Sequence, residues 1–407
     1  MGYFKDTIKG VSWMGALRGA TRVVAFLKIA ILARLLTPTQ FGVFGIGLLV
    51  LSFLEIMTDT GVNVFLIQEN AELSKYLNTA WVVSIARGAL ISLFILLSAP
   101  LVSAFFNSPE SYRVLMLTSL IPLVRGFINP AVVRFQKELL FAKEFSFRFL
   151  IFAIDGAVAI LAAFITHSAI SLIYGLLAGS IFEMLFSQVF IKPRPAFAFD
   201  SGKAKEIVGR GKWVTAAGIF NYLYENGDNV VVGRILDAAS LGLYQTAYRI
   251  SSLPITEIAD VVSRVTFPVY VKISGDMARL KKAYIKTLAA ITLAVLPIGV
   301  ILLFFTEPVV QIVLGDKWLG TVGVIKVLSF LGVIRAITMT ANPLFLSVKK
   351  QEYVMSVTLV GILGLAITIV PLVRSYGIVG AGFSAIIGAL TTVPVTFYFV
   401  YKFFAKT

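Results

Sequence analysis

Long apolar runs separated by short polar connections restrict what this chain can fold into. About twelve such runs, each roughly twenty residues long, match the hydrocarbon thickness of a bilayer when helical. Hydrophobic residues make up 58% of the chain and charged residues only 14%, which is too apolar for a soluble globule. The sequence therefore predicts an all-α polytopic membrane protein, with about twelve transmembrane helices near residues 11–33, 40–61, 78–105, 113–133, 146–166, 168–191, 213–236, 241–268, 286–306, 321–346, 354–373 and 377–401.

The basic residues predict an orientation. If the N-terminus is cytoplasmic, the connections on that side hold about 21 of the 36 lysines and arginines, and the opposite side holds about five. The most basic connection is "KPRPAFAFDSGKAKEIVGRGK" at 192–212. We therefore expect both termini to be cytoplasmic. Loops that face anionic lipid headgroups also account for the net charge of +15, so no nucleic acid partner is predicted.

The sequence repeats itself across this basic connection. "LARLLTPTQFGVFGI" at 32–46 returns as "VGRILDAASLGLYQT" at 232–246, and "VRGFINP" at 124–130 resembles "IRAITMTANP" at 334–343. Six predicted spans lie on each side, so both halves begin on the same side of the membrane. This pattern predicts two six-helix lobes related by a parallel internal repeat around a central cavity. The expected parts are an N-lobe at 1–191, a cytoplasmic basic linker at 192–212 and a C-lobe at 213–407.

The "ARLLTPTQFGVFGI" turn and its echo "GRILDAASLGLYQTAYRI" resemble the polysaccharide-transporter branch of the multidrug/oligosaccharidyl-lipid/polysaccharide exporter superfamily. Within that branch the likeness is to flippases for lipid-linked O-antigen or exopolysaccharide repeat units. The resemblance implies alternating access, a bacterial cytoplasmic (inner) membrane location and an undecaprenyl-diphosphate-linked oligosaccharide as cargo. Membrane lipids and a polysaccharide polymerase complex are the other implied partners.

Basic side chains inside the predicted spans support an anionic cargo. An isolated cation in hydrocarbon costs a few kcal/mol, so these side chains require water or an anion nearby. Basic residues near span ends can instead reach the headgroups, which is how we interpret Arg148, Arg264 and Lys326; for Arg18 both interpretations stay open. We predict a cationic N-lobe cavity and a substrate-binding set of Arg18, Arg22, Lys28, Arg87, Arg125, Arg249 and Arg335.

The C-lobe differs at the corresponding positions. Two hundred residues after Arg18, Arg22 and Lys28 stand Gly218, Tyr222 and Asp228. An aromatic and polar face suits sugars. We therefore predict that the oligosaccharide contacts Asn221, Tyr222 and Tyr224.

Acidic residues within the spans have two interpretations. Each could neutralise a nearby basic residue, or it could carry H⁺ or Na⁺ for an ion-gradient-driven cycle. The ion-coupling candidates are Asp155, Glu225 and Asp228. Near Asp228, "NGDN" at 226–229 contains poor helix formers, so we expect local unwinding there.

Other chemistry finds little support. No phosphate-binding GxxxxGK[ST] loop is present, and a chain with one histidine and no cysteine offers no His/Cys cluster, so we predict no cofactor, no bound metal and no enzyme activity. A drug or organic-cation exporter of the same superfamily is the alternative within transport. A membrane polysaccharide polymerase or ligase, or an assembly scaffold, is the alternative from another class.

Overall fold

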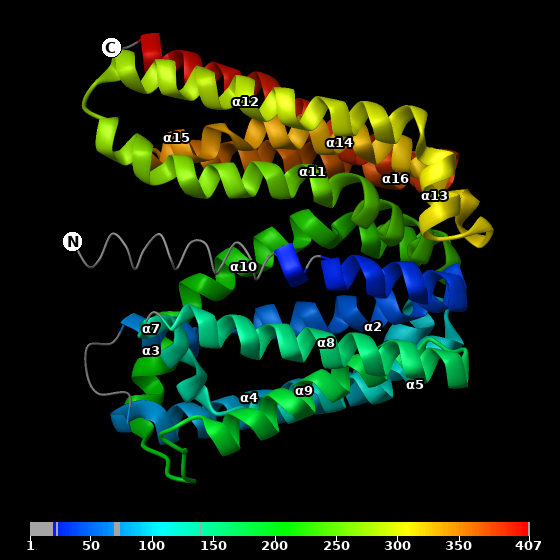
Figure 1. Cartoon of the computed structure of the whole chain (residues 1–407), viewed down its shortest axis with the longest axis vertical. Coiled ribbons are helices and arrows are strands. Elements are labelled where there is room, and N and C mark those ends of the chain that lie inside the picture. The colour runs from blue at the N-terminus through cyan, green and yellow to red at the C-terminus, as the bar shows by residue number, and fades with distance from the viewer. Residues whose placement is uncertain (1–18, 22, 69–73, 139, 406–407) are drawn as a thin grey trace. The chain divides into compact units, whose positions relative to one another are not determined.

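The computed structural model describes residues 19–21, 23–68, 74–138 and 140–405, and it is helical in both halves (Figure 1). The chain divides into two compact units, Met1–Asn226 and Gly227–Thr407. The division falls inside helix α10 (Ser201–Ile235), so the second half of the predicted basic linker is helical and continuous with the following segment.

The first unit contains a helical segment at 23–35 and the start of α10. Between them lie α2 (Pro38–Met57), α3 (Val62–Gln68), α4 (Ser74–Phe105), α5 (Pro109–Thr118), α6 (Leu120–Gly126), η1 (Pro130–Val133), α7 (Arg134–Lys137), α8 (Phe141–Thr166) and α9 (Ile170–Phe190). The predicted fourth span, 113–133, is broken: the pair Pro109–Gly126 and Pro130–Lys137 is bent by 71°. This break places polar backbone and side chains within the helix bundle.

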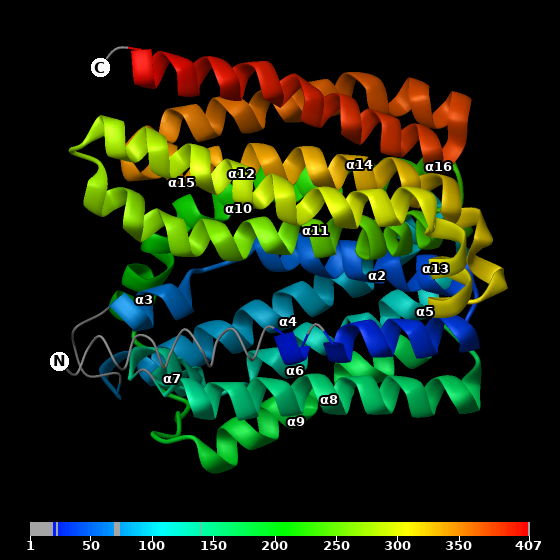
Figure 2. The same cartoon turned by 45° about the horizontal axis from the view of Figure 1, so that its top comes forward.

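The second unit contains α11 (Ala238–Ile273), α12 (Met277–Phe304), α13 (Thr306–Val313), η2 (Asp316–Thr321), α14 (Val322–Met339), α15 (Ala341–Ser347) and α16 (Gln351–Ala405). Figure 2 shows α11, α12, α14 and α16 running alongside one another, and they pack pairwise through α14. Gly377, with φ of 58°, divides α16 into two helices. That left-handed backbone suits glycine, and it separates the predicted spans 354–373 and 377–401.

The repeated sequence forms the same local structure in each unit. Thr37 caps α2 in a capping box with Gln40, and Asp237, 200 residues later, caps α11 by accepting a hydrogen bond of 2.6 Å from the Ser240 amide. A cap satisfies amide groups that a helix N-terminus leaves open. The recurring turn therefore supplies the N-terminal cap of α2 in the first unit and of α11 in the second.

Seven helices of the described residues are long and apolar enough to cross a bilayer, or eight if the bent pair counts as one span. α10 and α11 are equally long but carry more charged residues. Each predicted range overlaps helical residues, and the chain is a multi-pass membrane protein. The count of twelve spans stays a prediction.

Candidate substrate and ion site

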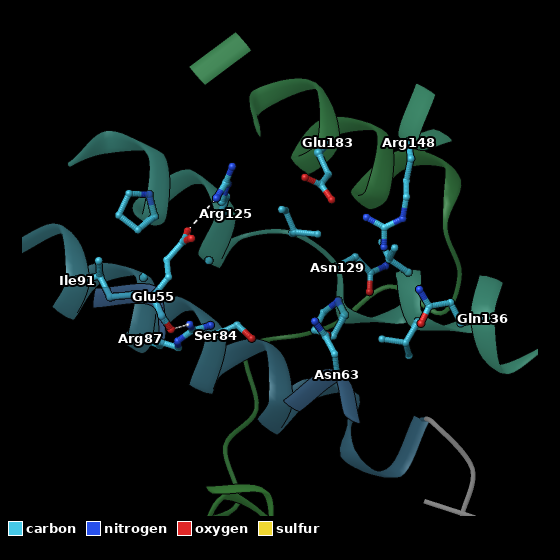
Figure 3. Close-up of a pocket in the computed structure, with 17 residues that line it drawn as sticks. Glu55, Asn63, Ser84, Arg87, Ile91, Arg125, Asn129, Gln136, Arg148 and Glu183 are labelled. Atoms are coloured by element: carbon cyan, nitrogen blue, oxygen red, sulfur yellow. Dashed lines mark hydrogen bonds and ion pairs between the residues drawn. The ribbon is translucent and has the colours of Figure 1, made fainter. Parts of the chain in front are cut away.

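The first unit encloses a polar cavity with a volume of about 310 Å³ (Figure 3). Helices α2, α4, α6, α8 and α9 supply its charged groups, and α3, α7 and the break after α6 supply its amides. The charged and amide side chains in its wall are Glu55, Asn63, Arg87, Arg125, Asn129, Gln136, Arg148 and Glu183. Three arginines and two glutamates among apolar helices favour a water-filled space, because hydrocarbon solvates such groups poorly.

Two glycines allow the cavity wall to form. A Cβ atom on Gly88 of α4 would lie 2.3 Å from the Pro122 carbonyl oxygen, and one on Gly126 of α6 would lie 2.9 Å from the Ser84 carbonyl oxygen. Only hydrogen fits at these two points, so α4 and α6 pack backbone to backbone. Arg87 and Arg125 each precede one of these glycines, which brings both arginines to the cavity.

Arg125 forms the central ion pair. Its Nη1 lies 2.8 Å from Glu55 Oε1, and its Nε donates to Ser180 Oγ at 3.3 Å. The side chains of Arg125 and Glu55 are 37% and 31% exposed, so the pair is reached by solvent. An arginine with this freedom can exchange its carboxylate partner for another anion.

Arg87 has a different role. Its Nη2 donates to the Glu55 carbonyl oxygen at 2.5 Å, and its Nε donates to Thr58 Oγ1 at 3.2 Å. These are groups at the C-terminus of α2, where carbonyls lack helical partners and a cation is favourable. Arg87 therefore caps α2 and positions Glu55.

The opposite wall carries a second carboxylate. Glu183 projects from α9 into the cavity (Figure 3), and among the described residues its carboxylate has no hydrogen-bond or ion-pair partner. Nearby, Arg148 pairs with Glu144 at 2.9 Å, and Gln136 donates to the same carboxylate at 2.7 Å. Arg148, which we interpreted as reaching the headgroups, lines the cavity and has a protein partner.

Two predicted residues with different expected roles pair with each other. Lys28 Nζ lies 2.7 Å from Asp155 Oδ1 and 2.8 Å from Oδ2, and the side chains are 15% and 13% exposed. Gly175 of α9 packs over this pair, since a Cβ there would lie 2.6 Å from Asp155 Oδ1. The charges of a predicted substrate-binding residue and a predicted ion-coupling residue thus neutralise one another.

The second unit buries its acid more deeply. Asp228 is 2% exposed; its Oδ2 accepts a 2.8 Å hydrogen bond from the Tyr244 hydroxyl, and its Oδ1 accepts one of 2.8 Å from the Asn229 amide. Arg335 of α14 donates a hydrogen bond to the Tyr248 hydroxyl, and its guanidinium carbon lies 5.9 Å from the centre of the Tyr248 ring. Two tyrosines four residues apart on α11 therefore contact an aspartate and an arginine, Tyr244 with Asp228 and Tyr248 with Arg335. The predicted unwinding at 226–229 is wrong, because α10 is helical throughout this stretch.

The remaining predicted residues are dispersed. Arg18, Arg22 and the side chain of Asn221 lie outside the described residues. Tyr222 is 5% exposed and donates to the Leu49 carbonyl at 2.7 Å, so its hydroxyl is engaged. Tyr224 and Arg249 are half-buried and Glu225 is exposed.

Sequence reasoning passed over Glu55, Glu183 and Tyr244 as site residues. Glu55 and Glu183 carry a usable signal, because each is an acid in the interior of a predicted span. Tyr244 carries none: within one sequence it resembles any apolar helical residue.

Comparison with known proteins decides the family. Residues 31–323 match the family described as "Polysaccharide biosynthesis protein". The chain belongs to this family. The match confirms the family resemblance that the repeated turn indicated. One relative is the teichuronic acid biosynthesis protein TuaB of Bacillus subtilis (strain 168), 25% identical over 342 residues, which are 82% of this chain and 69% of that one.

Solved structures show the fold. The lipid II flippase MurJ in an inward closed conformation aligns with a TM-score of 0.76 at 18% identity, over 95% of this chain and 87% of that chain. An inward-facing multidrug resistance MATE family transporter of the MOP superfamily aligns with a TM-score of 0.70 at 14% identity, over 95% of both chains. A fold shared by a lipid flippase and a drug transporter does not choose between those cargoes.

Proposed function

We propose that this protein is a flippase that moves a lipid-diphosphate-linked oligosaccharide from the inner to the outer leaflet of the bacterial cytoplasmic membrane by alternating access. The observation that carries the proposal is an arginine-lined polar cavity in a chain of a polysaccharide biosynthesis family. The drug transporter with the same fold is the alternative that the fold itself leaves open.

The proposed chemistry rests on arginine geometry. A diphosphate offers several acceptor oxygens, and a guanidinium presents a planar fork of donors that fits them. In the cavity, Arg125 is the available group, because Arg87 is engaged at the end of α2. Arg18, Arg22, Arg249 and Arg335 stay in the proposed substrate set, with Asn221, Tyr222 and Tyr224 toward the sugars.

We propose that an ion gradient drives the cycle. Asp155, Glu225 and Asp228 are the candidate carriers of H⁺ or Na⁺. Asp155 would bind the ion when its carboxylate separates from Lys28. Asp228 would bind the ion beside the Tyr244 hydroxyl.

The proposed topology has twelve spans, cytoplasmic termini and parts at 1–191, 192–212 and 213–407. A cysteine introduced at Ser201 should react only with membrane-permeant reagents in whole cells, whereas one at Gly315 should react with impermeant reagents. External labelling at Ser201 would overturn the twelve-span arrangement and the parallel repeat.

The transport test uses sealed vesicles containing the purified protein and a fluorescent polyprenyl-diphosphate oligosaccharide. We expect the protein to increase the fraction of label that an impermeant quencher reaches. Arg22→Ala should abolish this increase, and Arg22→Lys should retain part of it. Arg374→Ala, at an exposed arginine of α16, serves as the matched control. Export of a fluorescent organic cation without movement of the lipid would favour the drug exporter.

A further inference from the structure

A second cavity lies in the first unit, where α7, the start of α8 and the end of α9 meet. Its volume is about 640 Å³. α8 and α9 form a hairpin through residues 167–169, so the beginning of one and the end of the other lie at the same level. Both helices are long and apolar enough to span a bilayer. This cavity, the α7–α9 groove, therefore lies where a span ends and the headgroup region begins.

The floor of the α7–α9 groove is a row of phenylalanines. Ring centroids are 5.8 Å apart between Phe135 and Phe147, 5.1 Å between Phe147 and Phe186, and 4.8 Å between Phe186 and Phe190. Phe147 is 3% exposed, whereas Phe190 is 70% exposed. The row thus leads from the protein interior to an open apolar surface, which suits a hydrocarbon chain.

The rim of the groove is basic. Arg134, Lys143 and Lys192 line it with one carboxylate, that of Glu138. Arg134 is held by Glu138 at 2.7 Å and donates to the Lys192 carbonyl at 2.5 Å, which ties the segment after α9 to α7. Among the described residues, the ammonium groups of Lys143 and Lys192 have no hydrogen-bond or ion-pair partner. Two unpaired cations therefore stand above an apolar floor.

We propose that the α7–α9 groove binds an anionic phospholipid of the adjacent leaflet. Its phosphate lies between Lys143 and Lys192, and an acyl chain lies along the phenylalanine row. Basic groups where spans meet the interface attract anionic headgroups, and a free phosphate would leave the apolar floor uncovered. Sugars need hydrogen-bonding groups around them, and the floor of this groove is lined by phenylalanines, so the occupant is a membrane lipid rather than the oligosaccharide of the cargo.

Native mass spectrometry of the purified protein with phosphatidylglycerol or phosphatidylcholine of equal chain length tests this site. We expect tighter retention of phosphatidylglycerol. The double variant Lys143→Ala/Lys192→Ala should weaken that retention about tenfold or more, from about 1 kcal/mol per basic residue. Lys281→Ala/Lys282→Ala removes the same charge from two exposed lysines of α12 and should leave retention unchanged.

A second variant tests the apolar floor without altering charge. Ser146→Trp places an indole in the groove and should lower phosphatidylglycerol retention while Lys143 and Lys192 remain. Equal retention of both lipids, or equal retention by wild type and the double lysine variant, would overturn the proposal. Displacement of phosphatidylglycerol by an equimolar polyprenyl phosphate would also overturn it, since the occupant would then be an isoprenoid.

Discussion

Arg125 in the first unit and Arg335 in the second come from matching stretches of sequence, yet they have different surroundings. Arg125 pairs with a carboxylate, and both side chains are about one-third exposed to a polar cavity. Arg335 instead contacts a tyrosine hydroxyl and ring, beside an aspartate that is 2% exposed. Water thus reaches one arginine, whereas the other is packed against an aromatic ring.

The difference has an energetic meaning. A pair in contact with water can separate at modest cost, because solvent replaces the lost interactions. A buried polar cluster cannot, since removing one partner leaves the other without hydrogen bonds. We therefore expect the Arg125–Glu55 pair to exchange partners more readily during transport than the buried cluster around Asp228.

The largest expected effect is on the cavity wall itself. Gly88→Leu should prevent assembly of the first unit, because a Cβ there already lies 2.3 Å from a backbone oxygen. Size-exclusion chromatography of a fluorescent fusion should show loss of the monodisperse peak. Gly227→Ala, where no atom lies within 4 Å of the added Cβ, is the control and should give a normal peak. Normal behaviour of Gly88→Leu would contradict the close packing of α4 and α6.

The comparison predicts that removing Arg125 mainly lowers transport, whereas removing Arg335 mainly lowers stability. Arg125→Ala should lower lipid movement in vesicles at least about tenfold, the loss expected for a charge-assisted contact of 1.5 kcal/mol or more, with little change in thermal stability. Arg335→Ala should lower the apparent unfolding temperature and preserve more activity. The reverse pattern would make Arg335, rather than Arg125, the main contact for the diphosphate.

How well the sequence predicts a helix, a cap or a unit depends on how far apart along the chain the interacting residues lie. The helices and the capped turn at Thr37 and Asp237 follow from patterns within a few residues. The repeat predicts two lobes separated by residues 192–212, whereas the two compact units divide inside α10. That position could not be predicted, because it depends on which side chains pack around a continuous helix.

The site shows the same limit. The depth of Arg125 in its span indicated a polar environment, and the structure places it at a cavity. Its partner Glu55 lies 70 residues earlier, and Lys28 and Asp155 are separated by 127 residues. Spacing along one helix does not reveal which faces of different helices meet. The sequence therefore left two roles open for each acid, which could neutralise a basic residue or carry an ion. In the structure, Asp155 pairs with Lys28.

An intermediate effect is expected for the acids. Asp155→Asn should make lipid movement insensitive to an imposed proton or sodium gradient while the protein stays folded, because asparagine fills the site without a titratable charge. Asp228→Asn should behave alike if both acids carry ions. Gradient-dependent transport by the combined Asp155→Asn/Asp228→Asn variant would make both residues structural partners only.

The smallest effect concerns Tyr244. Tyr244→Phe removes one hydroxyl and leaves Asp228 Oδ2 buried without that donor, at a cost of about 1–3 kcal/mol. Because the acid keeps its hydrogen bond from the Asn229 amide, the fold should survive with a lowered apparent unfolding temperature. Combining Tyr244→Phe with Asp228→Leu removes both partners and should recover part of the lost stability, since no buried carboxylate oxygen is then left without that donor.

Tyr222→Phe is the matched control in the first unit. The Tyr222 hydroxyl donates to a carbonyl on α2, so the loss of this donor should cost less than the loss of a donor to a carboxylate. Equal losses for the two tyrosines would remove the distinction between a buried charged cluster and ordinary helix packing, and the contrast between the units would then rest on Arg125 and Arg335 alone.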